Sequence, residues 1–305
     1  MAITLSTSWN GGRHARAADA LREIRSLDFE RVELYAHWLP AQLPELKAAL
    51  AELGMRATSL HGPCPVLVDE AGNRAPYGDW LAEVDEQRRR IAVEAHKCTV
   101  DAAAELGARG VVVHLGNSGA RSLQKEIFET IRTHGAGSTE HCTLVEQARA
   151  ERRKAAGNGA LEAAIRSARE LGEHARGTGV GLGLECRDGF VEIPALDEYP
   201  PIFEACAGLP VYYWHDMGHG SKLENAGLVQ AEQYLRRFGD RLLGVHLHDT
   251  TLDRDHQAPG QGETDFGMLL PYLQPDTIKT LELSPRVEAD LIGPGVAVLH
   301  RAGIV

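Results

Sequence analysis

Two short stretches, VYYWHD at Val211–Asp216 and LGVHLH at Leu243–His248, carry the pattern that decides the fold. Each is rich in β-branched, aromatic or leucine residues, is too short for a helix, and ends in histidine or aspartate. Their apolar residues run together instead of alternating with polar ones, which is typical of a parallel strand covered on both faces. They therefore predict buried parallel strands with polar groups at their ends.

The rest of the chain extends this pattern into a regular alternation of strands and helices. Six further stretches have the same strand character: 3–6, 31–35, 57–61, 110–115, 180–186 and 278–283. Amphipathic stretches with helical spacing lie between the strands, at 17–26, 42–53, 85–106, 160–176, 229–238 and 266–273. Eight strands alternating with helices predict an α/β fold, a (β/α)8 or TIM barrel, formed by one domain over residues 1–305. The alternative is an open doubly wound sheet, but no GxGxxG turn follows the first strand.

The connection after the fourth strand, from Asn117 to Gly159, is much longer than the others. Lysine, arginine and glutamate are mixed along it, which favours a pair of solvated, charged helices. The alternative is a lid or wall over the barrel mouth, because long loops after the strands build that face. We expect a long helical insertion in either case.

Charge and cysteine content narrow the function classes. The formal net charge is -11, which argues against a nucleic-acid partner. The five cysteines are scattered and form no CxxC pair, so neither a disulfide framework nor a thiolate zinc site is expected. No apolar run reaches the length of a membrane span, and no basic segment followed by an apolar one opens the chain. We therefore expect no membrane partner and a cytoplasmic location.

Histidine, aspartate or glutamate lies at the end of six consecutive strands. These residues are His61, His114, Glu185, Asp216, His246 with His248, and Glu282, and His219 follows the sixth strand closely. The ends of parallel barrel strands meet on one face, so these side chains are expected to converge. A single buried histidine is readily explained as a core residue whose hydrogen bonds are satisfied. A carboxylate without a partner, however, costs much free energy to bury. Six strands that all end in such residues therefore indicate a divalent cation. The prediction is strongest for Glu185, Asp216, His246 and Glu282.

Several neighbouring residues are candidates for secondary roles. We expect His246 to be the ligand on the seventh strand and His248, two residues on, to contact the site from behind or to bind substrate. His256 precedes a Pro-Gly-x-Gly loop, where glycines let the backbone approach a ligand, and we interpret it as a further ligand. Trp214 could stack on a sugar or pack in the core. Glu33 lies near enough to the end of its strand to reach the pocket.

The order of these motifs resembles the xylose-isomerase-like barrel superfamily, which contains sugar-phosphate isomerases and epimerases and the endonuclease IV family. The resemblance covers nearly the whole chain. It rests on LHGP around His61, VVVHLG around His114, LGLECRDGFVEIP around Glu185, WHDMGH around Asp216, VHLHD around His246, DHQAPGQGETDF around His256 and LELS around Glu282. Each motif is weak alone, and only their order and position are specific for the superfamily.

The resemblance implies two different metal centres. In members similar to tagatose epimerase, one ion is held by four residues that match Glu185, Asp216, a histidine of the seventh strand and Glu282. In members similar to endonuclease IV, three zinc ions use those four and residues that match His61, His114, His219 and a downstream Asp-x-His. This chain has Arg254 at the matching aspartate position, which puts the third ion in doubt. One to three divalent ions, Mn²⁺, Zn²⁺ or Mg²⁺, are therefore expected.

Three functions are compatible with these residues. The first is isomerisation or epimerisation of a sugar or sugar phosphate by proton transfer through a metal-stabilised enediolate. Glu185 and Glu282 would move the proton, and His219 would stabilise the developing oxygen. Arg187 would orient a hydroxyl, carboxylate or phosphate of this small carbohydrate-like substrate, or would be only a salt-bridge partner.

The second function is phosphoester hydrolysis by a zinc cluster of the endonuclease IV type, which the nearly complete ligand set favours. The third is a non-catalytic metal-binding barrel, which is disfavoured because a barrel core needs no structural ion. A homo-oligomer that pairs through the loops at the mouth is compatible with each of the three.

Overall fold

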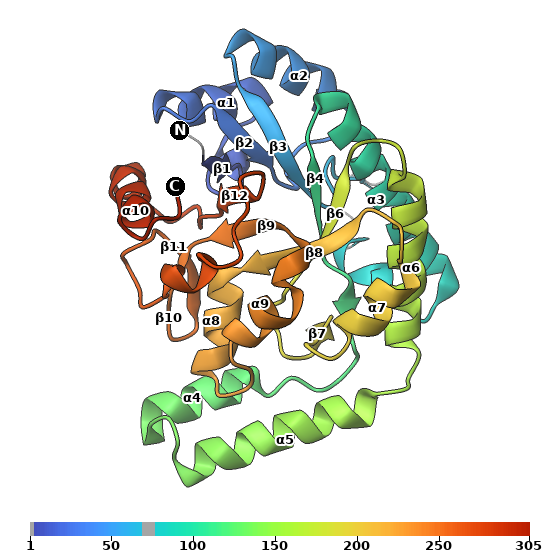
Figure 1. Ribbon diagram of the computed structural model, residues 1–305, viewed down its shortest axis with the longest axis vertical. Coiled ribbons are helices and arrows are strands. Elements are labelled where there is room, and N and C mark those ends of the chain that lie inside the picture. The colour runs from blue at the N-terminus through green and yellow to red at the C-terminus, as the bar shows by residue number, and fades with distance from the viewer. Residues whose placement is uncertain (1–2, 69–76) are drawn as a thin grey trace.

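Eight parallel strands close into a barrel that helices surround (Figure 1). The computed structural model describes residues 3–68 and 77–305. In chain order the barrel strands are β1 (Thr4–Ser6), β2 (Arg31–Leu34), β3 (Arg56–His61), β4 (Gly110–Val113), β6 (Gly181–Glu185), β8 (Val211–Asp216), β9 (Leu242–Leu247) and β12 (Ile278–Leu281). Pairing between β12 and β1 closes the ring, which confirms the predicted TIM barrel.

The outer layer is helical. It contains α1 (Ala17–Ser26), α2 (Leu43–Glu52), α3 (Glu86–Leu106), α6 (Ala160–Ala175), α7 (Tyr199–Ala205), α8 (Met217–Asn225), α9 (Glu232–Phe238) and α10 (Ala289–Arg301). Short 3-10 turns lie at Gly11–Arg13, Pro40–Gln42, Tyr77–Ala82, Gly239–Arg241 and Phe266–Leu269. Local sequence sets the ends of α3: the Asp85 carboxylate accepts from the backbone N–H groups of Gln87 and Arg88, and Gly107 adopts a φ of 71° after the last turn.

One expected helix is much shorter than its sequence pattern indicates. The amphipathic stretch 266–273 forms only the 3-10 turn Phe266–Leu269. Pro271 stands two residues after the end of this turn, and a proline lacks the backbone N–H that a continuing helix needs. The connection from β9 to β12 instead contains the antiparallel pair β10 (Asp249–Thr251) and β11 (Arg254–Gln257).

The segment between β4 and α6 contains the helices α4 (Gln124–His134) and α5 (Thr139–Ala155), which run together along one end of the molecule (Figure 1). A second apolar cluster joins them to α8; it consists of Leu123, Ile127, Phe128, Val145, Ala148, Leu223, Ala226 and Leu228. Arg152 of α5 donates to the backbone oxygen of Val191 at 2.9 Å, and Arg132 of α4 pairs with Asp253. The helix pair thus packs against loops that follow the barrel strands.

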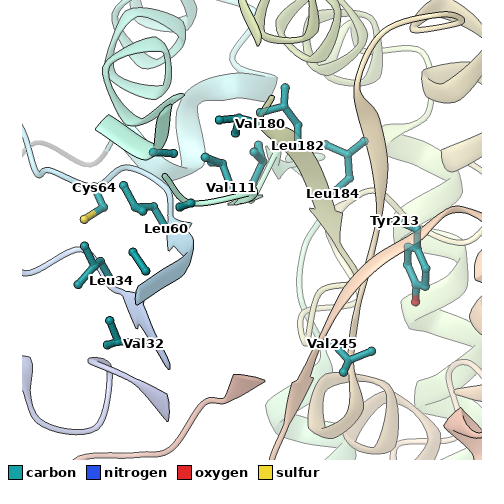
Figure 2. Packing of buried hydrophobic residues seen from close by; sticks show 14 of the residues in the cluster. Val32, Leu34, Leu60, Cys64, Val111, Val180, Leu182, Leu184, Tyr213 and Val245 are labelled. Atoms are coloured by element: carbon teal, nitrogen blue, oxygen red, sulfur yellow. The ribbon is translucent and has the colours of Figure 1, made fainter. Parts of the chain in front are cut away.

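Strand alternation sorts the side chains into two layers. Val111, Leu182, Leu184 and Val245 belong to the large cluster that the strands form with the helices around them, and Figure 2 shows them on β4, β6 and β9. The intervening positions point into the barrel, where Trp214 packs with other apolar side chains in a separate small cluster. Glu185 follows Leu184 on β6 and His246 follows Val245 on β9, so these two polar side chains face the axis of the barrel.

Substituting Gly244 by alanine is expected to destabilise the fold. A Cβ at this position would lie 2.3 Å from Cζ3 of Trp214, which is fully buried. Overpacking of this kind costs about 1–3 kcal/mol of unfolding free energy, measurable by urea denaturation. Gly12→Ala is the control, because Gly12 is exposed and the nearest atom to its new Cβ outside the adjoining residues is Cε1 of His37 at 3.6 Å, an ordinary van der Waals contact. Equal stability of the two variants would show that Trp214 does not fill the barrel interior in this way.

Candidate metal centre at the barrel mouth

The ends of β6, β8, β9 and β12 bring three carboxylates to one nitrogen of His246. Nδ1 of this ring lies 2.5 Å from Oε1 of Glu185, 2.9 Å from Oε2 of Glu282 and 3.4 Å from Oδ2 of Asp216. All four side chains are buried, and their ligand atoms lie within 4.8 Å of one another. A single ring N–H cannot serve three acceptors, whereas one cation can bind all four groups.

Charge in this group also fits a divalent ion. Burial acts to raise the pKa of Glu185 and of Glu282, but nearby histidines together outweigh it and hold both pKa values well below their usual range: His246 and His114 at Glu185, and His246 and His256 at Glu282. The same carboxylates, with Glu33, raise the pKa of His246 well above its usual value against the effect of burial. Four carboxylates against one imidazolium leave an excess of negative charge, which a bound divalent cation would balance. The donor set of three carboxylates and one imidazole suits Mn²⁺, Zn²⁺ or Mg²⁺.

Glu33 fixes the orientation of the His246 ring from the opposite side. Nε2 of His246 lies 3.2 Å from both carboxylate oxygens of Glu33, and the Ser59 hydroxyl donates to Oε2 of Glu33 at 2.7 Å. Nδ1 is therefore free to face the ligand group while Nε2–H donates to a buried carboxylate. Carboxylates placed in this way fix the tautomer and raise the basicity of a metal-binding histidine. The sequence placed Glu33 near the pocket but did not predict that it orients the ring of His246.

Glu33→Gln is expected to weaken divalent-metal binding by about 10–100-fold, because a neutral amide holds the ring less firmly and does not raise its basicity. Calorimetric titration of the apo protein with Mn²⁺ measures the change. Glu30→Gln is the matched control, since Glu30 is exposed and lies on the same segment. Equal Mn²⁺ affinities for the two variants would show that Glu33 does not support metal binding by His246.

A second group surrounds Asp216 and contains His219, His248 and His256. Asp216 caps α8: its Oδ1 accepts from the backbone N–H of His219 at 2.7 Å. Nδ1 of His219 lies 3.0 Å from the backbone oxygen of Cys186, so this nitrogen carries the proton and Nε2 is the remaining reactive atom. Burial acts to lower the pKa of His219, while Asp216 and Asp188 outweigh it and raise the pKa. His219 is thus positioned as a potential hydrogen-bond donor beside the centre.

The hydrogen bonds of His248 define its tautomer. The backbone N–H of His256 donates to Nδ1 of His248 at 2.8 Å, so Nδ1 carries no proton. Nε2 must therefore hold the proton, and it donates to Asp216 at 3.0 Å. A ring in this state orients the carboxylate but offers no lone pair at Nε2 to a metal. The unusual φ of 54° at His256 places its N–H in position for this contact.

The third group consists of His61, His114 and Glu185, and Arg187 contacts it. The rings of His61 and His114 meet edge to face with 4.6 Å between their centroids. Nη1 of Arg187 lies 2.6 Å from Nε2 of His114 and 2.8 Å from Oε2 of Glu185. Arg187 thus contacts two of the three candidate ligands, where sequence reasoning allowed either substrate contact or a surface salt bridge.

A pocket of about 770 Å³ opens beside the centre. Its lining includes Glu282 and His256, together with Tyr35, Arg254 and Arg286. The volume lies within the range typical of small-molecule sites. Trp214 was a candidate for stacking on the substrate, but its side chain is fully buried in the barrel and its centroid lies 5.1 Å from that of His246. Of the two alternatives for Trp214, the structure places it in the core.

All eight residues expected as metal ligands lie in the three overlapping groups: His61, His114, Glu185, Asp216, His219, His246, His256 and Glu282. Glu185 belongs to two of these groups, and Asp216 also belongs to two. The strands therefore bring together residues from six separate segments of the chain.

The chain belongs to the xylose isomerase-like TIM barrel family, whose sequence model matches residues 21–290. A relative in Sinorhizobium fredii, uncharacterized protein y4fM, is 24% identical over an alignment that covers 91% of this chain and 85% of the relative. Among residues 3–68 and 77–305, the structure contains no helix that is both long and apolar enough to span a membrane.

Solved structures share the fold over their whole length. The apo form of 3-keto-D-glucoside 4-epimerase from E. coli superposes with a TM-score of 0.69 at 21% identity, covering 99% of both chains. D-psicose 3-epimerase from Clostridium cellulolyticum, solved with D-tagatose, gives a TM-score of 0.66 at 14% identity and covers 100% of this chain and 99% of that one. At these identities the similarity establishes the fold.

Proposed function

We propose that this protein is a divalent-metal-dependent isomerase or epimerase of a sugar or sugar phosphate. The observation that carries the proposal is the convergence of three buried carboxylates on Nδ1 of His246 beside an open pocket. The epimerase activities named for the solved structures with the same fold support it. The ligands are Glu185, Asp216, His246 and Glu282. His248 donates a hydrogen bond that holds Asp216 in place, and Arg187 donates to Glu185.

Glu282 is the better placed of the two proposed proton carriers. It lines the pocket, and its Oε2 contacts His246, while its Oε1 lies 3.9 Å from Nε2 of His61. Glu185 uses Oε1 for His246 and Oε2 for His114 and Arg187. When bound, the ion supplies a Lewis acid that acidifies a C–H beside a carbonyl. Glu282 removes that proton, and Glu185 returns a proton from the other side of the mouth. His219 donates a hydrogen bond to the oxygen that gains charge.

Zinc-cluster hydrolysis of a phosphoester is the second candidate. The observation that favours it is the presence of His61, His114, His219 and His256 in groups that extend the four-residue centre. Hydrolysis by a cluster needs two or three ions close together. The guanidinium of Arg187 lies on the ligands of one such position, which disfavours a second cation there.

Solvent-proton exchange distinguishes the two functions. The protein, loaded with Mn²⁺, is incubated in D₂O with a panel of ketoses, 3-keto sugars and their phosphates, and carbon-bound deuterium is followed by NMR. We expect incorporation at the carbon beside the carbonyl of one substrate class. Cleavage of bis(p-nitrophenyl) phosphate by zinc-loaded protein, with no deuterium incorporated into any sugar, would instead identify the hydrolase.

A further inference from the structure

The Arg187 guanidinium occupies the place where a second cation would bind. Its Nη1 lies 2.6 Å from Nε2 of His114 and 2.8 Å from Oε2 of Glu185, and these two atoms lie 2.5 Å apart. With His61 they form one of the three groups able to hold an ion. A metal in this group would have to use the same two atoms that already contact Nη1.

The local structure holds Arg187 in this position. Oε1 of Glu192 accepts from Nε of Arg187 at 3.1 Å and lies 3.0 Å from Nη2, and Oε2 of Glu192 accepts from the backbone N–H of Gly189 at 2.8 Å. Glu192 begins β7 (Glu192–Ile193), which pairs with β5 (Gly116–Asn117) just beyond His114. The side chain of Arg187 is only 11% exposed. The guanidinium of Arg187 is therefore held in one position by Glu192, unlike that of an exposed arginine.

Electrostatics make the guanidinium and a metal ion mutually exclusive here. Arginine stays protonated in proteins, so its positive charge is permanent. A Zn²⁺ bound to nitrogen and oxygen ligands at about 2.0–2.2 Å would lie next to that charge in a buried setting, where repulsion between like charges is strong. The N–H groups of Nη1 also engage the lone pairs that an ion would need.

We propose that Arg187 acts as a built-in cation for the His61–His114–Glu185 group, so that no divalent ion binds in this group beside the ion of the proposed centre. The inference rests on the metal centre of the proposed function and sharpens it. A ligand set that resembles a multi-zinc hydrolase thereby loses one of its ion positions, which suits proton transfer better than cluster hydrolysis. Arg187 is thus the residue that closes this position to metal.

Metal content tests the inference without any activity assay. Apo protein is equilibrated with buffered free Zn²⁺, freed of unbound metal, and analysed by mass spectrometry for zinc per chain. We expect one more ion per chain in Arg187→Met, which keeps the apolar stem but removes the charge, than in the parent protein. The double variant Arg187→Met/His114→Ala should return to the zinc content of the parent, because the new site loses a ligand. Arg176→Met is the control, since Arg176 is exposed and lies away from these ligands, at the end of α6 that precedes β6.

The outcomes separate this inference from the proposed function. Equal zinc content in the parent and Arg187→Met would overturn the role of Arg187 and leave the metal centre intact. Retention of the additional zinc in the double variant would place that ion outside this group and likewise overturn the role of Arg187. His114→Ala alone gives a test that does not depend on the folding of Arg187→Met: a loss of one zinc per chain relative to the parent would show that an ion already binds in this group despite Arg187. A parent that binds no ion would remove the metal centre itself, and this inference with it.

Discussion

Glu282→Gln is expected to abolish solvent-proton exchange into substrate while leaving the barrel folded. Glutamine has nearly the same shape as glutamate, so the packing around β12 is preserved. It lacks the charge that binds the ion and the basicity that accepts the proton. Loss of a positioned general base alone lowers rates by about 10²–10⁴-fold, and loss of a metal ligand adds to that. NMR exchange rates with Mn²⁺ in excess measure the effect, and circular dichroism checks the fold.

The matched control for this experiment is Glu288→Gln. Glu288 lies six residues further along the chain, is exposed, and its side chain makes no capping hydrogen bond to the helix that it precedes. Its substitution should leave the exchange rate within about twofold of the parent, as is usual for a surface change that removes no specific contact. Full exchange activity in Glu282→Gln would show that Glu282 neither accepts the proton nor binds the ion.

The barrel could be predicted from sequence because parallel strands buried on both faces leave a strong local signal. The predicted bounds of β8 match the observed Val211–Asp216, and the other strand ends differ by only one or two residues. The convergence of Glu185, Asp216, His246 and Glu282 followed from topology, since the carboxyl ends of parallel strands share one rim. Sequence therefore predicted which side chains meet.

What sequence could not predict is how these side chains contact one another. Glu33 sits in the stretch RVEL and looks like an ordinary polar residue of a short strand, while its partner His246 is 213 residues away. The tautomer of His248 depends on one backbone N–H, which the left-handed conformation of His256 aims at the ring. The position of Arg187 depends on the pairing of two dipeptide strands, β5 and β7. None of these contacts leaves a periodic pattern in the chain.

Removing the divalent ion is expected to lower the thermal stability of the protein as well as its activity. Without the ion, Glu33, Glu185, Asp216 and Glu282 share a buried space whose central positive group is His246. Repulsion among buried carboxylates is relieved when a cation binds, so binding favours the folded state. At a free metal concentration of 100 times Kd the gain is about 2.7 kcal/mol. A melting temperature that rises with Mn²⁺ concentration, and falls on addition of a chelator, is the expected result.

Glu33→Gln makes this melting experiment specific to the proposed centre. If Glu33 supports the metal-binding nitrogen of His246, the variant should need about 10–100 times more Mn²⁺ for the same rise in melting temperature. The apo variant should nevertheless be no less stable than the apo parent by this electrostatic argument, because one of the repelling carboxylates has become neutral. A metal-induced shift that is identical in the variant and the parent would mean that the ion stabilises the protein from somewhere other than His246.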